Sequence, residues 1–310
     1  MLDFRIDTFL CVCRHLNFTK AAKELNITQP AVSQHIHHLE NEYGTKLFTQ
    51  DGKKLFLTDN GKLLYKKMNQ IKNDDESLKE ILSKNNHGLK DISFGVTMTI
   101  GEYIIADPIS DYIKNHPDTN LKITFGNTSE LLKKLSDGVI DFALVEGYFP
   151  ENDYETLLFS KEEFVPVCSA KHSFNQKPRV IKDLFPERIL IREPGSGTRN
   201  ILERALALNN YSTSDFRNFT QVENMHAIIS LIEKDCGITF LYKAAVASGL
   251  QSGYLKTIPL DDFRVKHDFT FIWPKDTVFS EEIRAICEEI QPITHSAFFA
   301  QLDNLITLHQ

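Results

Sequence analysis

FTKAAKELNITQPAVSQHIHHLENEYGTKL, residues 18–47, is the stretch that decides how this chain is organised. Its two halves have helical spacing and meet at Asn26-Ile27. Thr28 is a good N-cap for the second half, and Pro30 falls in the first turn, where a missing N–H is tolerated. The apolar residues expected to face the core are Ala21, Ala22 and Leu25 in the first half, and Val32, Ile36, Leu39 and Tyr43 in the second. This pattern predicts a helix-turn-helix, whose second helix enters the major groove of DNA.

The opposite face of the second predicted helix is polar. Amide and hydroxyl side chains in the first turns of such a helix reach base edges, and other hydrogen-bonding or basic groups reach phosphates. Amphipathicity alone does not establish DNA binding, because most surface helices have one polar face. The residues that we predict to contact DNA are Thr28, Gln29, Pro30, Ser33, Gln34, His37, His38, Lys53 and Lys54.

The order of residues strengthens this prediction. The pattern FTxAAxxLxxxQPAVSxxIxxLExxxGxxLF, followed by LTxxG at 57–61, resembles the amino terminus of the LysR-type transcriptional regulators over roughly the first sixty residues. The resemblance implies a winged helix-turn-helix, a dimerising linker helix and a sensor body. Gln50 stands where most relatives have Arg, so the wing has one cation fewer at that point.

Length and charge agree with a small cationic head on a larger body. The chain has 310 residues, enough for two domains. Its net charge is −7, but residues 1–67 hold ten Lys/Arg and seven Asp/Glu, which gives +3 and leaves −10 for the remainder. Local phosphate binding is compatible with this division, because charges farther away than about one Debye length are screened.

The composition also indicates in which cellular compartment the protein is expected. No apolar run approaches the ~20 residues that span a bilayer, and residues 1–7 have no signal-peptide character, so we expect a cytoplasmic protein. The odd number of scattered cysteines suggests reduced, mostly buried thiols: Cys11, Cys13, Cys168, Cys236 and Cys287. Cys11-Val-Cys13 lacks a second ligand pair with zinc-site spacing, so we predict that it packs in the core.

Further elements complete the predicted head. Phe4, Phe9, Leu10 and Val12 predict a first helix within 3–15, and the turn at 50–54 predicts a hairpin wing with Lys53 and Lys54 at its tip. Thr58 is expected to cap a helix over about 59–86. Its apolar seam, interrupted by Asp75, predicts dimerisation with a second copy, with packing on the chain's own body as the alternative: Leu64, Met68, Ile71, Leu78 and Leu82.

From residue 88 onward, strand-like runs alternate with helical patterns, which predicts an α/β fold with βαβ units and a parallel sheet. Predicted strands are 92–96, 121–125, 142–145, 164–169, 189–191, 219–222, 238–241 and 268–273, and predicted helices are 101–115, 129–137, 198–208, 225–234 and a last one from 280. The resemblance implies a two-lobed body like a periplasmic binding protein, with crossings near 164–169 and 265–273. The predicted domains are a winged helix-turn-helix (1–58), a linker helix (59–88) and an effector-binding domain (89–310), with lobe I at 89–163 and 269–310 and lobe II at 164–268.

Three predicted strand–helix junctions carry small polar residues, at 96–103, 126–129 and 192–199. Open α/β sheets bind ligands at such junctions. The last segment, REPGSGTR, combines flexible glycines, hydroxyl donors and two arginines that can bind an anion bidentately. A strand–helix turn with Ser and Thr as helix caps explains the same residues. The spacing GxxxxGK[ST] is absent, which argues against nucleotide hydrolysis.

REPGSGTR together with TIGEY resembles a subgroup of the family that includes regulators of sulfur assimilation and of carbon fixation. The resemblance implies that these turns line an effector cleft. Glu146 and Glu193 would either repel a dianion or bind a ligand amine. The residues predicted to contact the effector are Thr97, Thr99, Ile100, Asn127, Thr128, Glu146, Arg192, Glu193, Gly195, Ser196, Gly197, Thr198 and Arg199.

We find no G-x-S-x-G nucleophile elbow, and His35, His37 and His38 fall on the predicted DNA face. A metal held by two of these histidines, spaced i and i+3, is an alternative to solvated or phosphate-binding side chains; we expect no metal, no cofactor and no catalysis. We predict a homodimeric or homotetrameric transcription factor whose operator binding or promoter activation responds to a small anionic metabolite, with RNA polymerase as a further candidate partner. The alternatives are a DNA-tethered solute-binding module and an architectural DNA-binding protein.

Overall fold

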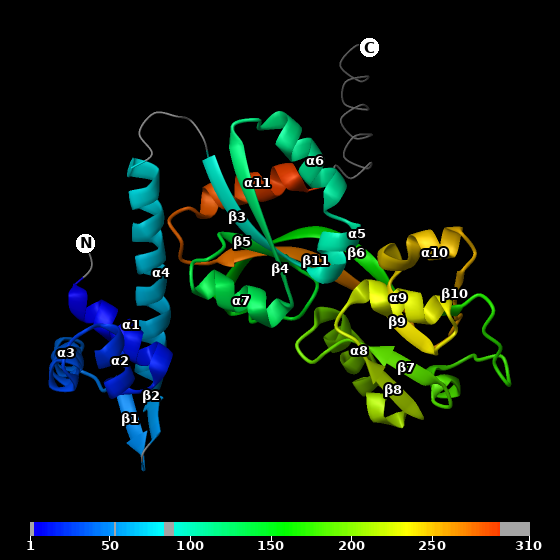
Figure 1. Cartoon of the computed structure of the whole chain (residues 1–310), viewed down its shortest axis with the longest axis horizontal. Coiled ribbons are helices and arrows are strands. Elements are labelled where there is room, and N and C mark those ends of the chain that lie inside the picture. The colour runs from blue at the N-terminus through cyan, green and yellow to red at the C-terminus, as the bar shows by residue number, and fades with distance from the viewer. Residues whose placement is uncertain (1–2, 53, 84–89, 292–310) are drawn as a thin grey trace, which may run out of the picture. The chain divides into compact units, whose positions relative to one another are not determined.

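The computed structural model describes residues 3–52, 54–83 and 90–291. The chain divides into two compact units, which we call the head (α1 to α4, with β1 and β2) and the body (β3 to α11). Figure 1 shows the elements of both units. In the described residues, we find no helix that is both long and apolar enough to cross a membrane.

The head begins with α1 (Phe4–His15), α2 (Phe18–Glu24) and α3 (Gln29–Glu42), which confirms the predicted helix-turn-helix. The side chains of Asp3, Asn17 and Thr28 cap the three helices by accepting hydrogen bonds from N–H groups of the first turns. Asn26 has φ +54°, a left-handed conformation that Asn tolerates well, and so turns the chain between α2 and α3.

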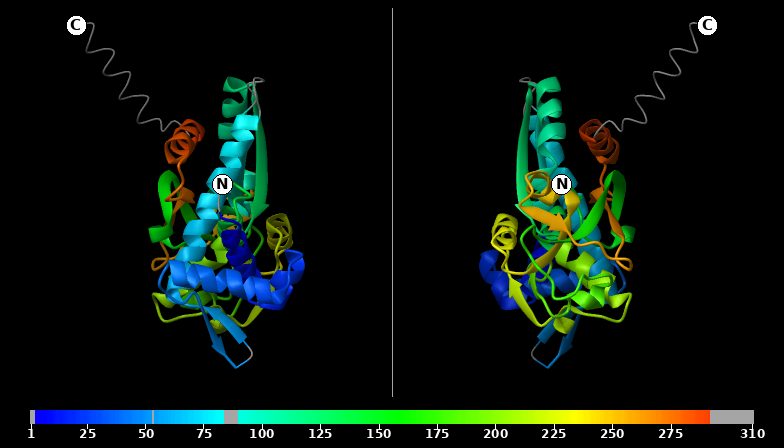
Figure 2. Two further views of the ribbon diagram at one scale, coloured as in Figure 1. Left: turned by 90° about the vertical axis from the view of Figure 1, so that its left-hand side faces the viewer. Right: turned by 90° about the vertical axis from the view of Figure 1, so that its right-hand side faces the viewer.

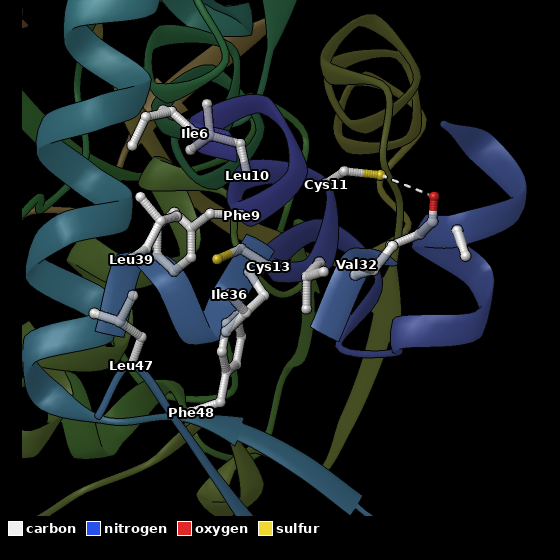
Figure 3. Packing of buried hydrophobic residues seen from close by; sticks show 13 residues of the cluster. Ile6, Phe9, Leu10, Cys11, Cys13, Val32, Ile36, Leu39, Leu47 and Phe48 are labelled. Carbon is white, nitrogen blue, oxygen red and sulfur yellow. Dashed lines mark hydrogen bonds between the residues drawn. The ribbon is translucent and has the colours of Figure 1, made fainter. Parts of the chain in front are cut away.

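The head's core is apolar and lies between α1, α3 and the start of the hairpin (Figure 3). Phe9, Leu10 and Cys11 of α1 are buried there with Val32, Ile36 and Leu39 of α3. Two residues predicted for this core are outside it. Phe4 is 58% exposed because it begins α1 and lies edge-on against the His35 ring, and Tyr43 is 44% exposed because it is the C-cap residue of α3.

A two-stranded antiparallel hairpin follows, formed by β1 (Phe48–Asp51) and β2 (Lys54–Leu57). Gly52 in its turn has φ +58°, which glycine adopts without strain. The hairpin projects away from the helices of the head, as Figure 2 shows. The predicted wing is therefore present, although Lys53 lies outside the described residues.

Helix α4 (Asp59–Ser83) begins after Thr58, whose hydroxyl accepts a hydrogen bond from the Gly61 N–H at 2.9 Å. The predicted end of this helix, at residues 84–86, lies outside the described part of the chain. The predicted seam is only partly right. Leu64 and Met68 pack on the head's own core and are therefore not available for contact with a second copy. Ile71, Leu78 and Leu82 are exposed.

The body is built on a nine-stranded sheet with the order β4-β3-β5-β11-β6-β9-β7-β8, to which β10 adds beside β6. Its strands are β3 (Lys90–Thr97), β4 (Thr119–Gly126), β5 (Phe142–Val145), β6 (Tyr154–Ser169), β7 (Arg188–Ile191), β8 (Asn218–Gln221), β9 (Ile238–Tyr242), β10 (Leu255–Thr257) and β11 (Val265–Pro274). Its helices are α5 (Met98–Tyr103), α6 (Ala106–Asn115), α7 (Thr128–Ser136), α8 (Gly197–Ala207), α9 (Met225–Glu233), α10 (Ala247–Gln251) and α11 (Ser280–Ile290), with single 3-10 turns η1 (Glu151–Asp153), η2 (Ile181–Leu184), η3 (Thr213–Asp215) and η4 (Lys243–Val246).

Two parallel halves make up this sheet, one of β3, β4 and β5 and the other of β7, β8 and β9. Strands β6 and β11 run antiparallel to each other between them, from the pair Tyr154↔Pro274 to the pair Phe164↔Val265 (Figure 1). Strand β6 continues beyond this point along β9, and β11 also pairs with β5. The two predicted crossings of the chain are therefore these two long central strands.

Two of the predicted elements need correction. The helix predicted over 101–115 is split into α5 and α6, because Pro108 lacks an N–H and its ring would clash with the carbonyl of Ile104 in a continuous helix. The strand predicted at 164–169 is only the last part of β6. The part before residue 164 includes the apolar residues Leu157, Leu158 and Phe159, but the polar run at 160–163 separates them from the predicted strand.

The prediction that the cysteine thiols are free and mostly buried is confirmed for four of the five cysteines. Cys11, Cys13, Cys168 and Cys287 are buried and free, and Cys236 is free but exposed. Cys11 and Cys13 belong to the head's core, as predicted.

Candidate functional site

Helix α3 exposes most of the side chains that we predicted for DNA contact. Gln29, Pro30, Gln34, His37 and His38 are exposed. They lie opposite the buried apolar stripe, so the core holds the helix while its polar face stays free. Two further predicted residues belong to the helix start. The Thr28 hydroxyl accepts the Ala31 N–H, and the half-buried Ser33 accepts a hydrogen bond from the Gln29 amide at 2.9 Å.

His35 differs from the prediction. It is half-buried rather than on the exposed face, because its Nδ1 is 3.0 Å from the hydroxyl of Thr8 on α1. The other histidines of α3 lie near carboxylates of their own helix, His37 near Glu40 and His38 near Glu42. His35 and His38 are thus engaged separately, which does not favour the metal pair considered above.

Lys54 is exposed at the start of β2, on the described side of the hairpin turn. The Gln50 amide donates to the Gly52 carbonyl at 3.0 Å and so helps to close the turn. A cationic residue is therefore present on the described side of the turn, where a wing would meet a phosphate backbone.

Another candidate cluster in the head consists of Cys11, His15 and Glu24, whose ligand atoms lie within 4.8 Å of one another. Glu24 accepts hydrogen bonds from His15 and Arg14, which lower its pKa to about 2. The Cys11 thiol is buried, and its pKa is raised by burial and by Glu24. A residue set of this kind is able to bind a transition metal, but Arg14 already neutralises its carboxylate.

In the body, the predicted effector residues gather at the ends of parallel strands. Strands β3, β4, β5 and β7 end at Thr97, Gly126, Val145 and Ile191. Helices α5 and α7 begin at or within two residues of two of these ends, and α8 begins after the loop at 192–196. Such ends place helix N-termini and loop residues along one edge of a sheet.

Glu146 connects these segments. It is only 1% exposed, and its Oε1 accepts a hydrogen bond from the Thr198 hydroxyl at 2.9 Å. The hydroxyls of Thr198 and Thr99 are 3.4 Å apart. The structure thus joins the end of β5, the start of α5 and the start of α8, three junctions that are distant in the sequence.

Glycines allow this close approach. A Cβ on Gly197 would lie 2.7 Å from Cγ of Glu146, and a Cβ on Gly147 would lie 2.4 Å from the Thr128 hydroxyl. Gly195 has φ +90°, which favours glycine, and its position brings the loop before α8 toward Asn127. Larger residues would therefore push the segments of the cluster apart.

Four buried polar atoms in this cluster have no hydrogen-bond partner: Thr97 Oγ1, Thr128 Oγ1, Glu146 Oε2 and Arg192 Nη1. Burial raises the pKa of Glu146, although the Thr99 and Thr198 hydroxyls and the charge of Arg192 act in the opposite direction. Buried polar atoms are normally paired, so a group of unpaired ones suggests a site that something else completes.

The two arginines are less available than we predicted. Nε and Nη2 of Arg192 form a bidentate pair with Glu193, at 2.8 and 3.0 Å. Arg199 binds Glu203, the Arg192 carbonyl and Gln221. The predicted bidentate capacity for an anion is therefore used inside the protein, which leaves Nη1 of Arg192.

Other predicted residues shape the site without offering it a polar side chain. Ile100, a residue of α5, is fully buried. Asn127 caps α7, because its Oδ1 accepts the Glu130 N–H at 2.9 Å. Ser196 is buried at the N-cap of α8 but makes no side-chain capping bond. A cavity of about 10 Å³ lies beside Arg192, Thr198 and Arg199, and its other lining residues are apolar except for Thr239.

The sequence analysis missed Tyr242 at the end of β9. It is fully buried, its hydroxyl donates to the Glu146 carbonyl at 3.4 Å, and burial raises its pKa well above the ordinary value. It also missed the group of Glu102, Tyr103 and His226, in which His226 lies 3.2 Å from Glu102. Tyr242 could have been found as another polar residue at a strand end.

Comparison with known proteins assigns both units. Residues 5–62 match the model of the bacterial regulatory helix-turn-helix proteins of the lysR family, and residues 88–292 match the LysR substrate binding domain. The chain is 29% identical over 269 residues to the HTH-type transcriptional regulator CysL of Bacillus subtilis, covering 86% of this chain and 89% of CysL. It is 25% identical over 292 residues to a probable RuBisCO transcriptional regulator of Phaeodactylum tricornutum, covering 90% and 95%.

Among solved structures, full-length LysG of Corynebacterium glutamicum with bound effector Arg has the same fold, with a TM-score of 0.63 and 16% identity over 94% of this chain and 98% of that one. The helix-turn-helix and the two-part sheet are thus those of full-length regulators of this type. The chain belongs to the LysR family, and it is a DNA-binding transcriptional regulator with an effector-binding domain.

Proposed function

We propose that this regulator changes its operator binding, or its activation of a promoter, when a small polar metabolite binds at the strand ends of the body. The observation that carries the proposal is the group of four unpaired buried atoms on Thr97, Thr128, Glu146 and Arg192. A ligand that pairs these atoms would remove their desolvation cost, about 1–3 kcal/mol for each unpaired group.

Several segments would contact one ligand. Thr97, Thr99, Thr128 and Glu146 lie at or after the ends of strands of the first parallel half of the sheet. The loop at 192–196 and the start of α8 follow β7 of the second half. We assign these halves to lobe I (89–163 and 269–310) and lobe II (164–268). A ligand that contacts both lobes favours one relative orientation of them, and it shifts DNA binding only by its difference in affinity between orientations.

For DNA reading, we propose that Gln29, Pro30, Ser33 and Gln34 contact base edges from the first turns of α3. Thr28, His37, His38, Lys53 and Lys54 would then contact phosphates. The exposure of the described residues of the α3 face and of Lys54 supports this assignment. The effect of salt on affinity would report the phosphate contacts.

For assembly, we propose a homodimer through α4, with tetramers formed by further contacts and RNA polymerase as a partner at the promoter. Ile71, Leu78 and Leu82 support the dimer, because they leave an apolar stripe exposed on a 25-residue helix. Two heads would fit a two-fold operator.

The test is footprinting and mobility shift with the intergenic DNA upstream of the protein's own gene, with and without a low-molecular-weight metabolite extract. We expect a two-fold protected region whose extent or affinity changes when the extract is added. Binding that does not distinguish this DNA from random DNA would contradict the proposal, and so would specific binding that no extract changes. A DNA-tethered solute-binding module would bind metabolite without any change in the footprint.

A further inference from the structure

The Glu146 side chain of the body lies at the start of α8. Glu146 arrives from the end of β5, and both the hydroxyl and the backbone N–H of Thr198 interact with its carboxylate. Ser196, the N-cap residue of α8, makes no side-chain capping bond. The carboxylate of Glu146 therefore occupies the position that a bound anion takes at a helix N-terminus.

In the described part of the chain no cation forms a salt bridge with this carboxylate, although the charge of Arg192 acts to lower its pKa. Arg192 is paired with Glu193, and Arg199 is paired with Glu203. Within the described residues, we find no Lys, Arg or His nitrogen within 4 Å of a Glu146 oxygen. Oε2 of Glu146 also lacks any hydrogen-bond donor, although the residue is almost completely buried. A buried charge without a partner is unfavourable, so the site favours a ligand that brings a donor with positive charge.

Three buried hydrogen-bond donors without an acceptor belong to residues at or just after the ends of β3, β4 and β7. They are the hydroxyls of Thr97 and Thr128 and Nη1 of Arg192. Oxygen atoms of a ligand, such as those of a carboxylate, would accept from them. The cluster thus offers one acceptor and three donors to a ligand.

We infer that the effector is a small zwitterion of the amino-acid class, whose ammonium group binds Oε2 of Glu146 and whose carboxylate binds the donors on Thr97, Thr128 and Arg192. This inference rests on the proposed function, since it assumes that the effector binds in this cluster. It replaces the purely anionic metabolite expected from the sequence, because a second anion beside Glu146 would meet a buried carboxylate.

The test is titration calorimetry of the full-length protein with matched compounds. Each set contains a protein amino acid and the 2-hydroxy and 2-oxo acids of the same skeleton, for example aspartate, malate and oxaloacetate, and inorganic phosphate and sulfate are added to the panel. We expect at least one amino acid to bind, and its two amine-free relatives to bind at least tenfold more weakly.

Glu146→Gln provides the decisive variant. The amide oxygen can keep the hydrogen bond from Thr198, while the amide NH₂ takes the place of Oε2. The NH₂ group and the ligand's ammonium group are both hydrogen-bond donors, so they cannot pair. We expect the amino acid to bind the variant at least tenfold more weakly and the amine-free acids to lose nothing. Glu163→Gln, which removes an exposed carboxylate paired with Lys243, is the control and should leave all affinities unchanged.

Three results would overturn the inference: a best ligand without an amine, an amino acid that binds wild type and Glu146→Gln equally, or no binding by any amino acid in the panel. None of them removes the proposed function, which fails only if the upstream DNA is not bound specifically or if no metabolite extract changes that binding. The two failures are therefore distinguishable.

Discussion

The head and the body treat their buried polar groups in opposite ways. In the described part of the chain, all seven buried side-chain atoms without a hydrogen-bond partner lie in the body. The head's two buried polar residues are both paired: Thr8 with His35, and Glu40 with Lys46 and the Leu47 N–H. An unpaired buried group lowers stability, so its retention points to a role in binding.

The difference shows how each unit performs its function. The head is complete by itself, since its core is apolar and its DNA-reading groups are exposed. The body is incomplete at its strand ends, where the residues of four of the seven unpaired atoms lie. Substitutions on the head's surface should therefore alter contacts with DNA or a second copy, whereas substitutions inside the body's cluster should alter ligand binding.

The largest effect is expected at the exposed stripe of α4. Replacing Ile71 and Leu78 with Glu puts charge into the proposed dimer contact, and loss of two linked heads should weaken operator binding by roughly 100-fold or more. Light scattering should show fewer subunits. Glu76→Lys, on the far side of the helix, is the control and should keep the wild-type mass. An unchanged mass for the double variant would exclude this stripe as the contact.

A smaller effect is expected from the base-reading face. Gln29→Ala should cost about 1–3 kcal/mol on the specific operator and almost nothing on random DNA, because a base contact carries the sequence information. Fluorescence anisotropy measures both affinities. Lys54→Ala is the contrasting variant and should weaken both DNAs alike, with a shallower salt dependence. Equal losses for Gln29→Ala on both DNAs would assign it to a non-reading role.

Within the body, Thr99→Val and Thr198→Val keep the side-chain shape and remove the hydroxyl. We expect each to leave operator affinity without effector nearly unchanged and to lower effector affinity by about 1 kcal/mol, the usual value of a hydrogen bond. Calorimetry with the best-binding compound of the panel checks this. Full-strength binding by both variants would place the ligand elsewhere.

The smallest effect is a pH dependence of the body without ligand. Burial raises the pKa of Glu146, so the contribution of this carboxyl to stability is present at low pH and is lost as the pH rises through its folded value. Gln does not titrate. The stability of Glu146→Gln relative to wild type should therefore increase between about pH 5 and about pH 8. Denaturant unfolding at both pH values measures it.

Glu163→Gln is the counterpart, because hydrogen bonding to Lys243 lowers the pKa of Glu163. Its carboxylate loses its stabilising effect as the pH falls. The same comparison should therefore give no increase in relative stability with pH. If both variants respond alike, the difference between a buried and an exposed carboxylate does not govern the effect.

The sequence predicted the head well because its elements depend on local patterns. The Thr28 cap, the Pro30 turn and the stripe of Val32, Ile36 and Leu39 all act within a few residues. The break before Pro108 was missed because apolar periodicity continued through it. The part of β6 before residue 164 was missed because the polar run at 160–163 interrupts its apolar pattern, and because it pairs with β11, which is distant in the sequence.

For the cluster in the body, the sequence predicted three separate strand–helix junctions but not the contacts between them. Polar residues at strand ends identified Thr97, Thr128 and Thr198, but no local pattern shows that Glu146 reaches Thr198 or that Glu193 and Glu203 neutralise the two arginines. Those pairings depend on contacts across the sheet, and they determine the charge that a ligand must have.

The most direct test of the link between the two units is reciprocal. Operator affinity of wild type is measured by anisotropy with and without saturating concentrations of the best-binding amino acid, and the affinity for that amino acid is measured by calorimetry with and without operator DNA. Because coupling between two sites is mutual, both affinities should change by the same factor, expected between roughly 5- and 150-fold. Tight binding of the amino acid that leaves operator affinity and the footprint unchanged would contradict the account.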